Sequence, residues 1–233
     1  MKYLFLLVPL LSTHVLTAQN QVAVFDLDVN PGQVIRDIKL PPPKTEGNVY
    51  LDDNWHFGNF AMNGTPLYEG FQLRYDLQHQ NLEIKVDGQI KVCVVSILDE
   101  FYFIGKSTTL NSHFISLNNI ENSFIIGHKG IVKILVDDKV KLYKNYFLET
   151  QKANYSPTTD TGSRNNKIIK KSSYYLDDNN TIVKLSTSLK KSKAVFGTYF
   201  SKVEKYAKKN KLKLKNEQEM IALVNYYNTL LSK

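Results

Sequence analysis

The chain has 233 residues, a formal net charge of +8 and a single cysteine. That length holds one large domain, or one domain with a small appendage. One cysteine excludes an internal disulfide, so a hydrophobic core must hold the fold together. Hydrophobic residues make up 42% of the chain, which is sufficient for such a core.

Residues 1–18 have the features of a secretory signal peptide. Lys2 supplies the positive charge, residues 3–11 form a mostly apolar run, and Ala18 is a small residue at a plausible cleavage point. The run is too short to span a bilayer comfortably, which disfavours the alternative of an uncleaved anchor. No cysteine stands near the cut to carry a lipid. We therefore expect an exported protein, periplasmic or secreted, without a transmembrane helix.

Residues 50–103 predict an antiparallel β-meander. Aromatic and β-branched segments are separated there by turn residues, of which Asn63-Gly64 and Asp87-Gly88 are the clearest. Both central positions of a type I′ hairpin turn need φ > 0, and these dipeptides supply it at little steric cost. The expected strands span residues 55–62, 67–75, 82–86, 89–96 and 101–104.

Shorter β segments are expected as far as residue 185. They are strands at 113–115 and 124–126, and hairpins formed by 131–136 with 140–147 and by 173–176 with 181–185. Residues 149–172 are polar, which predicts a long mobile loop. The spacing of strands suits an antiparallel sheet that curls or closes into a barrel-like form. The fold class is therefore mainly β.

Near residue 187 the hydrophobic period changes from that of a strand to that of a helix. Phe196, Phe200 and Val203 share one face of a predicted helix over residues 193–209. Asn216, with Glu219 three residues later, predicts an N-cap and a capping box that open a second helix over 217–231.

Two helices of this size are too small to fold alone, so they should dock on the sheet. We expect an α+β organisation with a small C-terminal helical segment. Its parts are a signal peptide (1–18), a β-rich domain (19–187) and a basic helical segment (188–233).

Motifs for catalysis, metal binding and cofactor binding are missing from the sequence. The histidines beyond the signal peptide are not spaced as metal ligands. Cys93 stands among valines and is expected to pack as a small buried hydrophobe. Arg74 is expected to form a cross-strand ion pair, and Trp55 to reach the core. We assign no catalytic residue, no metal site and no cofactor.

Positive charge is concentrated towards the C-terminus. Residues 164–215 contain 15 basic and 3 acidic residues, a balance of +12, whereas residues 19–160 contain 13 and 17, a balance of −4. A basic segment suits an anionic membrane surface or an acidic envelope protein, and export argues against nucleic acid. The alternative is a solvated helix face. The candidate binding residues are Lys202, Lys205, Lys208, Lys209, Lys211 and Lys213.

Several short patterns follow one another in a familiar order. They are Tyr-Leu-x-x-x-Trp from Tyr50, an Asn-Gly turn at Asn63, Leu-Arg-Tyr-Asp at 73–76 and Leu-Val-x-Tyr-Tyr-Asn at 223–228. In these, and over most of its mature length, the chain resembles a group of exported proteins of Bacteroidota-type bacteria to which no function is assigned. The resemblance implies a Gram-negative envelope setting and carries over no site residue.

Three functions remain open from the sequence. The first is a non-enzymatic binding or structural module of the envelope, suggested by export and by the uneven charge. The second is a periplasmic carrier of a lipid or other apolar ligand, held inside a curled sheet covered by helices. The third is an enzyme with a dispersed site around Asp53, His56 and Arg74. The ligand, the partner and the oligomeric state stay open.

Overall fold

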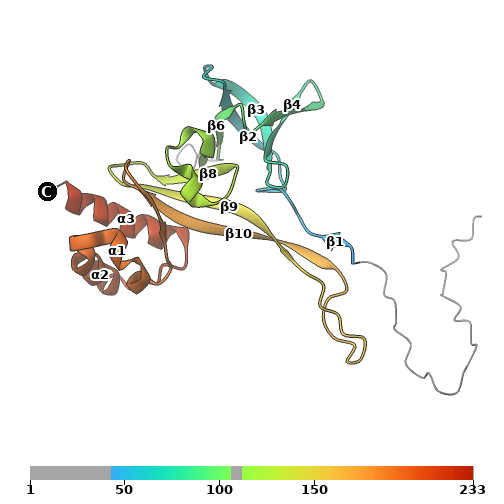
Figure 1. The fold of residues 1–233 in the computed structure, drawn as a ribbon. Coiled ribbons are helices and arrows are strands. Elements are labelled where there is room, and N and C mark those ends of the chain that lie inside the picture. Colours follow the sequence, from blue (N-terminus) through green and yellow to red (C-terminus); the bar gives the residue numbers. More distant parts are fainter. Residues whose placement is uncertain (1–42, 106–111, 233) are drawn as a thin grey trace, which may run out of the picture. The chain divides into compact units, whose positions relative to one another are not determined.

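The computed structural model describes residues 43–105 and 112–232 (Figure 1). The described residues belong to one compact unit, Pro43–Lys233. The expected signal peptide at residues 1–18 lies outside the described residues.

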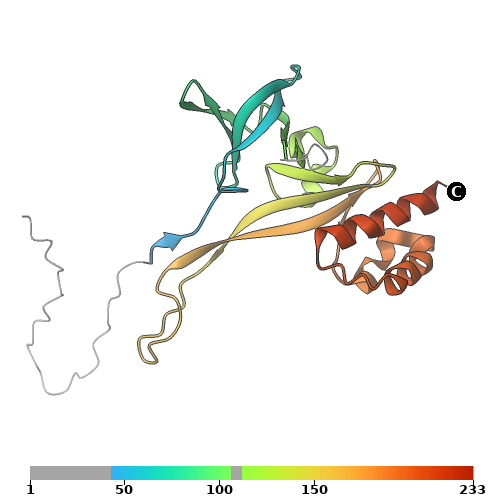
Figure 2. The same ribbon diagram turned by 180° about the vertical axis from the view of Figure 1, so that it is seen from behind.

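An eleven-stranded sheet forms the main part of this unit (Figures 1 and 2). The strands are β1 (Thr45–Glu46), β2 (His56–Met62), β3 (Tyr68–Asp76), β4 (Asn81–Val86), β5 (Gln89–Val94), β6 (Leu98–Phe103), β7 (Ser112–Ser116), β8 (Ile131–Val136), β9 (Lys141–Gln151), β10 (Asn166–Asp177) and β11 (Ile182–Leu185). Their order is β1-β10-β9-β8-β7-β6-β2-β3-β4-β5, and β11 also pairs with β10. Among the described strands, β1 and β5 end this order without pairing with each other, so the sheet is open. The predicted mainly β fold class is confirmed, and the pairing is antiparallel except for β1 with β10.

The two predicted type I′ turns are confirmed. Asn63 and Gly64 have φ angles of 50° and 68°, and Asp87 and Gly88 have φ angles of 51° and 76°. The second turn joins β4 to β5. Because it contains only two residues, it fixes the register of that hairpin.

One face of the sheet, here called the inner face, carries two hydrophobic cores. Phe101, Phe114, Lys133 and Lys144 are successive cross-strand partners on this face from β6 to β9. The aromatic core consists of Phe60, Leu73, Tyr75, Leu77, Leu82, Ile84, Cys93, Leu98, Phe101, Phe103, Phe114 and Ile131. The helix core consists of Val136, Val140, Leu142, Leu176, Leu185, Phe196, Val203, Ala207, Leu214, Met220, Leu223, Val224 and Leu230.

Three α-helices contribute to the helix core: α1 (Lys193–Phe196), α2 (Phe200–Lys209) and α3 (Glu217–Leu231) (Figure 1). The bounds of α3 match the prediction. The expected continuous helix over 193–209 is wrong, because Gly197 interrupts it with φ 51° and ψ −128°. A residue with a side chain rarely adopts that conformation, whereas glycine does so at little cost.

The opposite, outer face is covered in part by short 3₁₀ helices, η1 (Leu117–Asn119) and η2 (Ser123–Ile126). The predicted strand at 124–126 is therefore wrong. Asn122 and Gly127 flank η2 with φ angles of 59° and 72°, and these left-handed residues turn the chain out of an extended path. Ile126 is buried there, and its carbonyl accepts a hydrogen bond from the Tyr175 hydroxyl at 3.1 Å.

The loop predicted over 149–172 is shorter in the structure, because strand occupies both of its ends. β9 continues to Gln151 and β10 begins at Asn166, so only the segment between them is irregular. Eleven residue pairs join the two strands, from Lys167 opposite Gln151 to Asp177 opposite Lys141. Most side chains at this end of the β9–β10 pair are exposed, so polar residues there are compatible with a strand as well as with a loop.

Candidate functional site

The six lysines predicted to bind a partner lie on α2 and on the loop that follows it. The structure divides them into two sets. The pocket set, Lys208, Lys211 and Lys213, lines a pocket together with residues 188–190. The outer set, Lys202, Lys205 and Lys209, stands at positions i, i+3 and i+7 on an exposed face of α2 and does not line that pocket.

This lysine pocket has a volume of about 530 Å³. It is lined by Ser188, Leu189, Lys190, Glu204, Ala207, Lys208, Lys211, Leu212 and Lys213. Ala207 is buried and the two leucines are half-buried, so the floor is apolar, whereas the four lysines are exposed and form a rim. Glu204 pairs with Lys208 at 3.0 Å, which leaves the rim positively charged overall. Such a surface suits an anionic group attached to an apolar one.

Glu219 fixes the loop that carries part of this rim. Its Oε2 accepts hydrogen bonds from the backbone N–H groups of Lys213 and Lys215, both at 3.0 Å. The predicted N-cap at Asn216 is confirmed, because its Oδ1 accepts a hydrogen bond from Glu219 N–H at 2.9 Å. The predicted capping box is wrong, because the Glu219 carboxylate accepts from the two loop amides instead of from the N-cap backbone. Leu214, with φ 55° and 2% exposure, anchors the loop in the helix core. The hydrogen bonds from these backbone N–H groups, chiefly the one from Lys215, lower the pKa of Glu219 and keep its carboxylate charged.

A second pocket, of about 310 Å³, lies beside the aromatic core. It is lined by Leu51, Asp52, His56, Phe103, Ile104, Gly105, Ser112, Phe114, Lys133 and Tyr146. The His56 ring stacks on Phe103 with centroids 4.5 Å apart. His56 Nε2 is 3.3 Å from Asp52 Oδ2, without hydrogen-bond geometry. A backbone hydrogen bond from Asn54 is the main cause that lowers the pKa of Asp52.

Two lysines of the inner face share one carboxylate. Lys133 on β8 and Lys144 on β9 stand directly opposite each other and bind Glu217, the first residue of α3, at 2.9 and 3.0 Å. Burial would raise the pKa of Glu217, but its bonds to the two ammonium groups outweigh this and hold the pKa below its ordinary value. This arrangement ties α3 to the sheet and engages both lysines.

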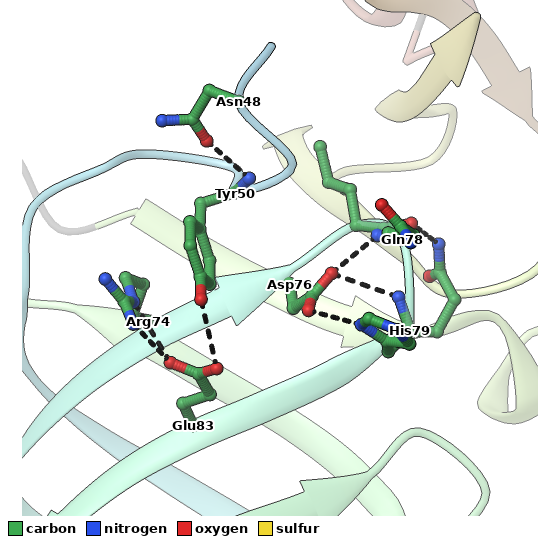
Figure 3. A network of polar contacts seen from close by, with 9 residues as sticks. Asn48, Tyr50, Arg74, Asp76, Gln78, His79 and Glu83 are labelled. Carbon is green, nitrogen blue, oxygen red and sulfur yellow. Dashed lines mark hydrogen bonds and ion pairs between the residues drawn. The ribbon is translucent and has the colours of Figure 1, made fainter. Parts of the chain in front are cut away.

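Arg74 lies on the outer face in a network of polar contacts (Figure 3). Its Nε and Nη2 atoms donate to Glu83 Oε2, directly opposite on β4, at 3.0 and 2.7 Å. Its guanidinium carbon lies 3.8 Å from the centroid of the Tyr50 ring and 4.5 Å from that of Trp55. The predicted cross-strand ion pair is confirmed. The prediction that Trp55 reaches the core is wrong, because its half-buried ring packs on Arg74.

The dispersed enzyme site suggested for Asp53, His56 and Arg74 is not brought together. His56 stands opposite Leu73 in the β2–β3 ladder, so Arg74, the next residue, points to the other face of the sheet. Asp53 is exposed in the turn before β2. Across residues 43–105 and 112–232, no three His, Cys, Asp or Glu side chains gather closely enough to hold a metal ion.

Three of the four pocket lysines were among the six candidates from the sequence, whereas Lys190 and the apolar floor were not. Leu189 stands beside Lys190, and Leu212 stands between Lys211 and Lys213. Leucines within a lysine-rich stretch were the available signal of an apolar floor, because large apolar residues are uncommon in a segment that is fully exposed to solvent.

Comparison of the chain with family models, curated proteins and solved structures gives no match. Within the part of the chain that the structure describes, no helix combines the length and the apolar character needed to cross a membrane.

Proposed function

We propose that the protein is an exported, non-enzymatic binding module of the bacterial envelope that recognises an anionic lipid through the lysine pocket. One observation carries this proposal: four exposed lysines surround an apolar floor in a pocket of about 530 Å³. The rim suits a phosphate or carboxylate headgroup, and the floor suits the first carbons of an attached chain. Export rests on the signal-peptide features of residues 1–18 and on the resemblance to exported proteins.

Binding to vesicles tests this proposal directly, because the two lysine sets provide a matched control. Replacing Lys208, Lys211 and Lys213 by glutamine removes three charges from the pocket. Replacing Lys202, Lys205 and Lys209 removes three charges from the outer face of the same helical segment. A lysine near an anionic surface contributes roughly 1 kcal/mol, so we expect the pocket variant to lose on the order of 100-fold in affinity for anionic vesicles. The outer variant should lose only a few-fold.

Sedimentation with anionic and with zwitterionic vesicles measures both affinities. Equal losses from the two variants would indicate diffuse charge attraction and would count against a site at the pocket. Absence of binding by the unaltered protein would refute the lipid proposal. Capture of an acidic protein instead would indicate that the lysine rim binds a protein and not a lipid.

Carriage of a lipid, the second function, is distinguished by whether the ligand leaves the membrane with the protein. The apolar floor of the lysine pocket is the observation that supports this second function. Native mass spectrometry of protein purified without detergent should show an adduct, removable by organic extraction, if the protein is a carrier. A clean apo mass supports binding at a membrane surface.

A further inference from the structure

Strand β5 ends the order of the strands that the structure describes. It pairs with β4 and, among the described strands, with no other. Ile90, Val92 and Val94 of this strand are 54%, 54% and 44% exposed, and these three residues are here called the apolar edge. An exposed apolar edge strand is unusual, because its unpaired backbone groups attract another strand.

The hydrogen-bond pattern of the hairpin leaves these same residues with outward backbone groups. A two-residue turn is flanked by a hydrogen-bonded pair, to which Gln89 belongs here, and such pairs recur at every second residue. Gln89, Lys91 and Cys93 therefore bond to β4. The residues of the apolar edge direct their N–H and C=O groups away from β4. The carbonyl of Val94 also accepts from Ile97 N–H at 3.1 Å, which marks the end of the strand.

We propose that β5 pairs with β5 of a second copy of this chain, in an antiparallel seam centred on Val92. In this register Val92 faces Val92 of the second copy, and Ile90 faces Val94. All three residues of the apolar edge then stand in hydrogen-bonded pairs, each of which exchanges two backbone hydrogen bonds. Their side chains form one apolar stripe across the seam. This inference is independent of the lysine pocket.

Charge and register together favour this pairing. Outward residues must face outward residues, so the neighbouring registers are centred on Lys91 or on Cys93. Centring on Lys91 sets it directly against its own copy, and like charges in that position are destabilising. Centring on Cys93 leaves Ile90 without a partner. The register centred on Val92 places Lys91 opposite Cys93 and pairs the whole edge, so the strand is complementary to itself.

A seam of one strand per copy is small. A standard protein interface involves about 20–30 residues on each side, so we expect a dissociable dimer whose fraction rises with protein concentration. Sedimentation velocity over a concentration series measures this equilibrium on the intact mature protein.

Two substitutions at the centre of the seam test the proposal. Val92→Lys places two like charges at the two-fold axis, and Val92→Pro removes an N–H group that points away from β4 and so costs no ladder bond. Each should weaken dimerisation by roughly tenfold or more. Val183→Lys on β11 is the matched control, since Val183 is an exposed strand valine, 37% accessible, outside the apolar edge. It should leave dimerisation unchanged, and circular dichroism checks that each variant is folded.

Cross-linking gives a second readout that does not depend on loss of affinity. Hydrogen-bonded pairs have Cα atoms about 5.5 Å apart, within the roughly 4.4–6.8 Å that a disulfide spans. Val92→Cys should therefore form a covalent homodimer on mild oxidation, whereas Val183→Cys should not. Cys93 is 3% exposed and does not compete. A monomer at every concentration, a dimer that Val92→Lys leaves intact, or pairing of β5 only with a different protein would each overturn the proposal.

Discussion

The aromatic core and the helix core share the inner face of one sheet but are covered in different ways. Met220 and Leu223 of α3 are fully buried over the helix core. Tyr75 and Phe101 are equally buried in the aromatic core, yet none of the described helices contributes to it. The Phe101 ring stacks on Tyr75 and on Phe114, with centroids 5.6 and 4.7 Å apart, so side chains of β3, β6 and β7 close over one another.

The difference shows what each half of the sheet needs. Large aromatic rings fill the aromatic core, because each ring buries a large area and stacks at a defined distance. The helix core is mainly aliphatic and depends on α2 and α3 for cover. Stacked side chains cover this part of the inner face but not the edge of the sheet, where β5 pairs, among the described strands, with β4 alone.

Phe101→Ala should have the largest effect on this comparison. Removing a fully buried ring should cost about 3–5 kcal/mol in the free energy of unfolding. Because both cores rest on one sheet, we expect the fluorescence of Trp55, the single tryptophan, and the helical circular dichroism to change together in urea. Two separate transitions would show that the cores unfold independently. Phe124→Ala is the control, since Phe124 is 79% exposed and should change stability by less than about 0.5 kcal/mol.

Asn228→Ala should weaken the packing of α3 over the helix core by removing a buried polar contact. The Asn228 amide accepts from Val140 N–H and donates to Val140 C=O, both at 2.9 Å and both buried. Alanine leaves two buried backbone groups without partners, which should cost about 1–3 kcal/mol. Chemical denaturation measures the loss. Asn225→Ala on the exposed face of α3 serves as the matched control, and a similar loss there would contradict the role given to the Asn228 amide.

Local chemistry made much of this fold predictable from the sequence. The φ angles of Asn63-Gly64 and Asp87-Gly88, the N-cap at Asn216 and the bounds of α3 all follow from residues close together in the chain. The polar extension of β10 could not be predicted in the same way, because its order comes from pairing with β9 and not from burial.

The same limit applies to the candidate site. The sequence identified six lysines, but it could not separate those around the pocket from those on the outer face of α2. That separation depends on Leu214, which is drawn into the helix core at φ 55°, and on Glu219, which holds the backbone of Lys213. Both contacts are set by the turn between two helices, for which spacing alone gives no signal.

Glu217→Gln sharpens the comparison at the point where α3 meets the sheet. It removes the carboxylate shared by Lys133 and Lys144, which should cost about 1–2 kcal/mol near neutral pH. The pKa of Glu217 is lowered in the folded state, so its contribution is present above the unfolded pKa of about 4.3 and is lost as the pH falls. The stability difference between the two proteins should therefore close in acid. A difference that stays constant with pH would contradict this account.

Arg74→Lys should have the smallest effect, because it alters the outer face and leaves both cores intact. Lysine keeps the charge but loses the planar fork on Glu83 and the stacking between Tyr50 and Trp55. We expect a loss of about 0.5–1 kcal/mol together with a change in Trp55 fluorescence, measured in the same denaturation experiment. Lys184→Ala, at an exposed position of β11, should change neither quantity. A loss from Arg74→Lys as large as that from Phe101→Ala would mean that the outer face, and not stacking on the inner one, holds this half of the sheet together.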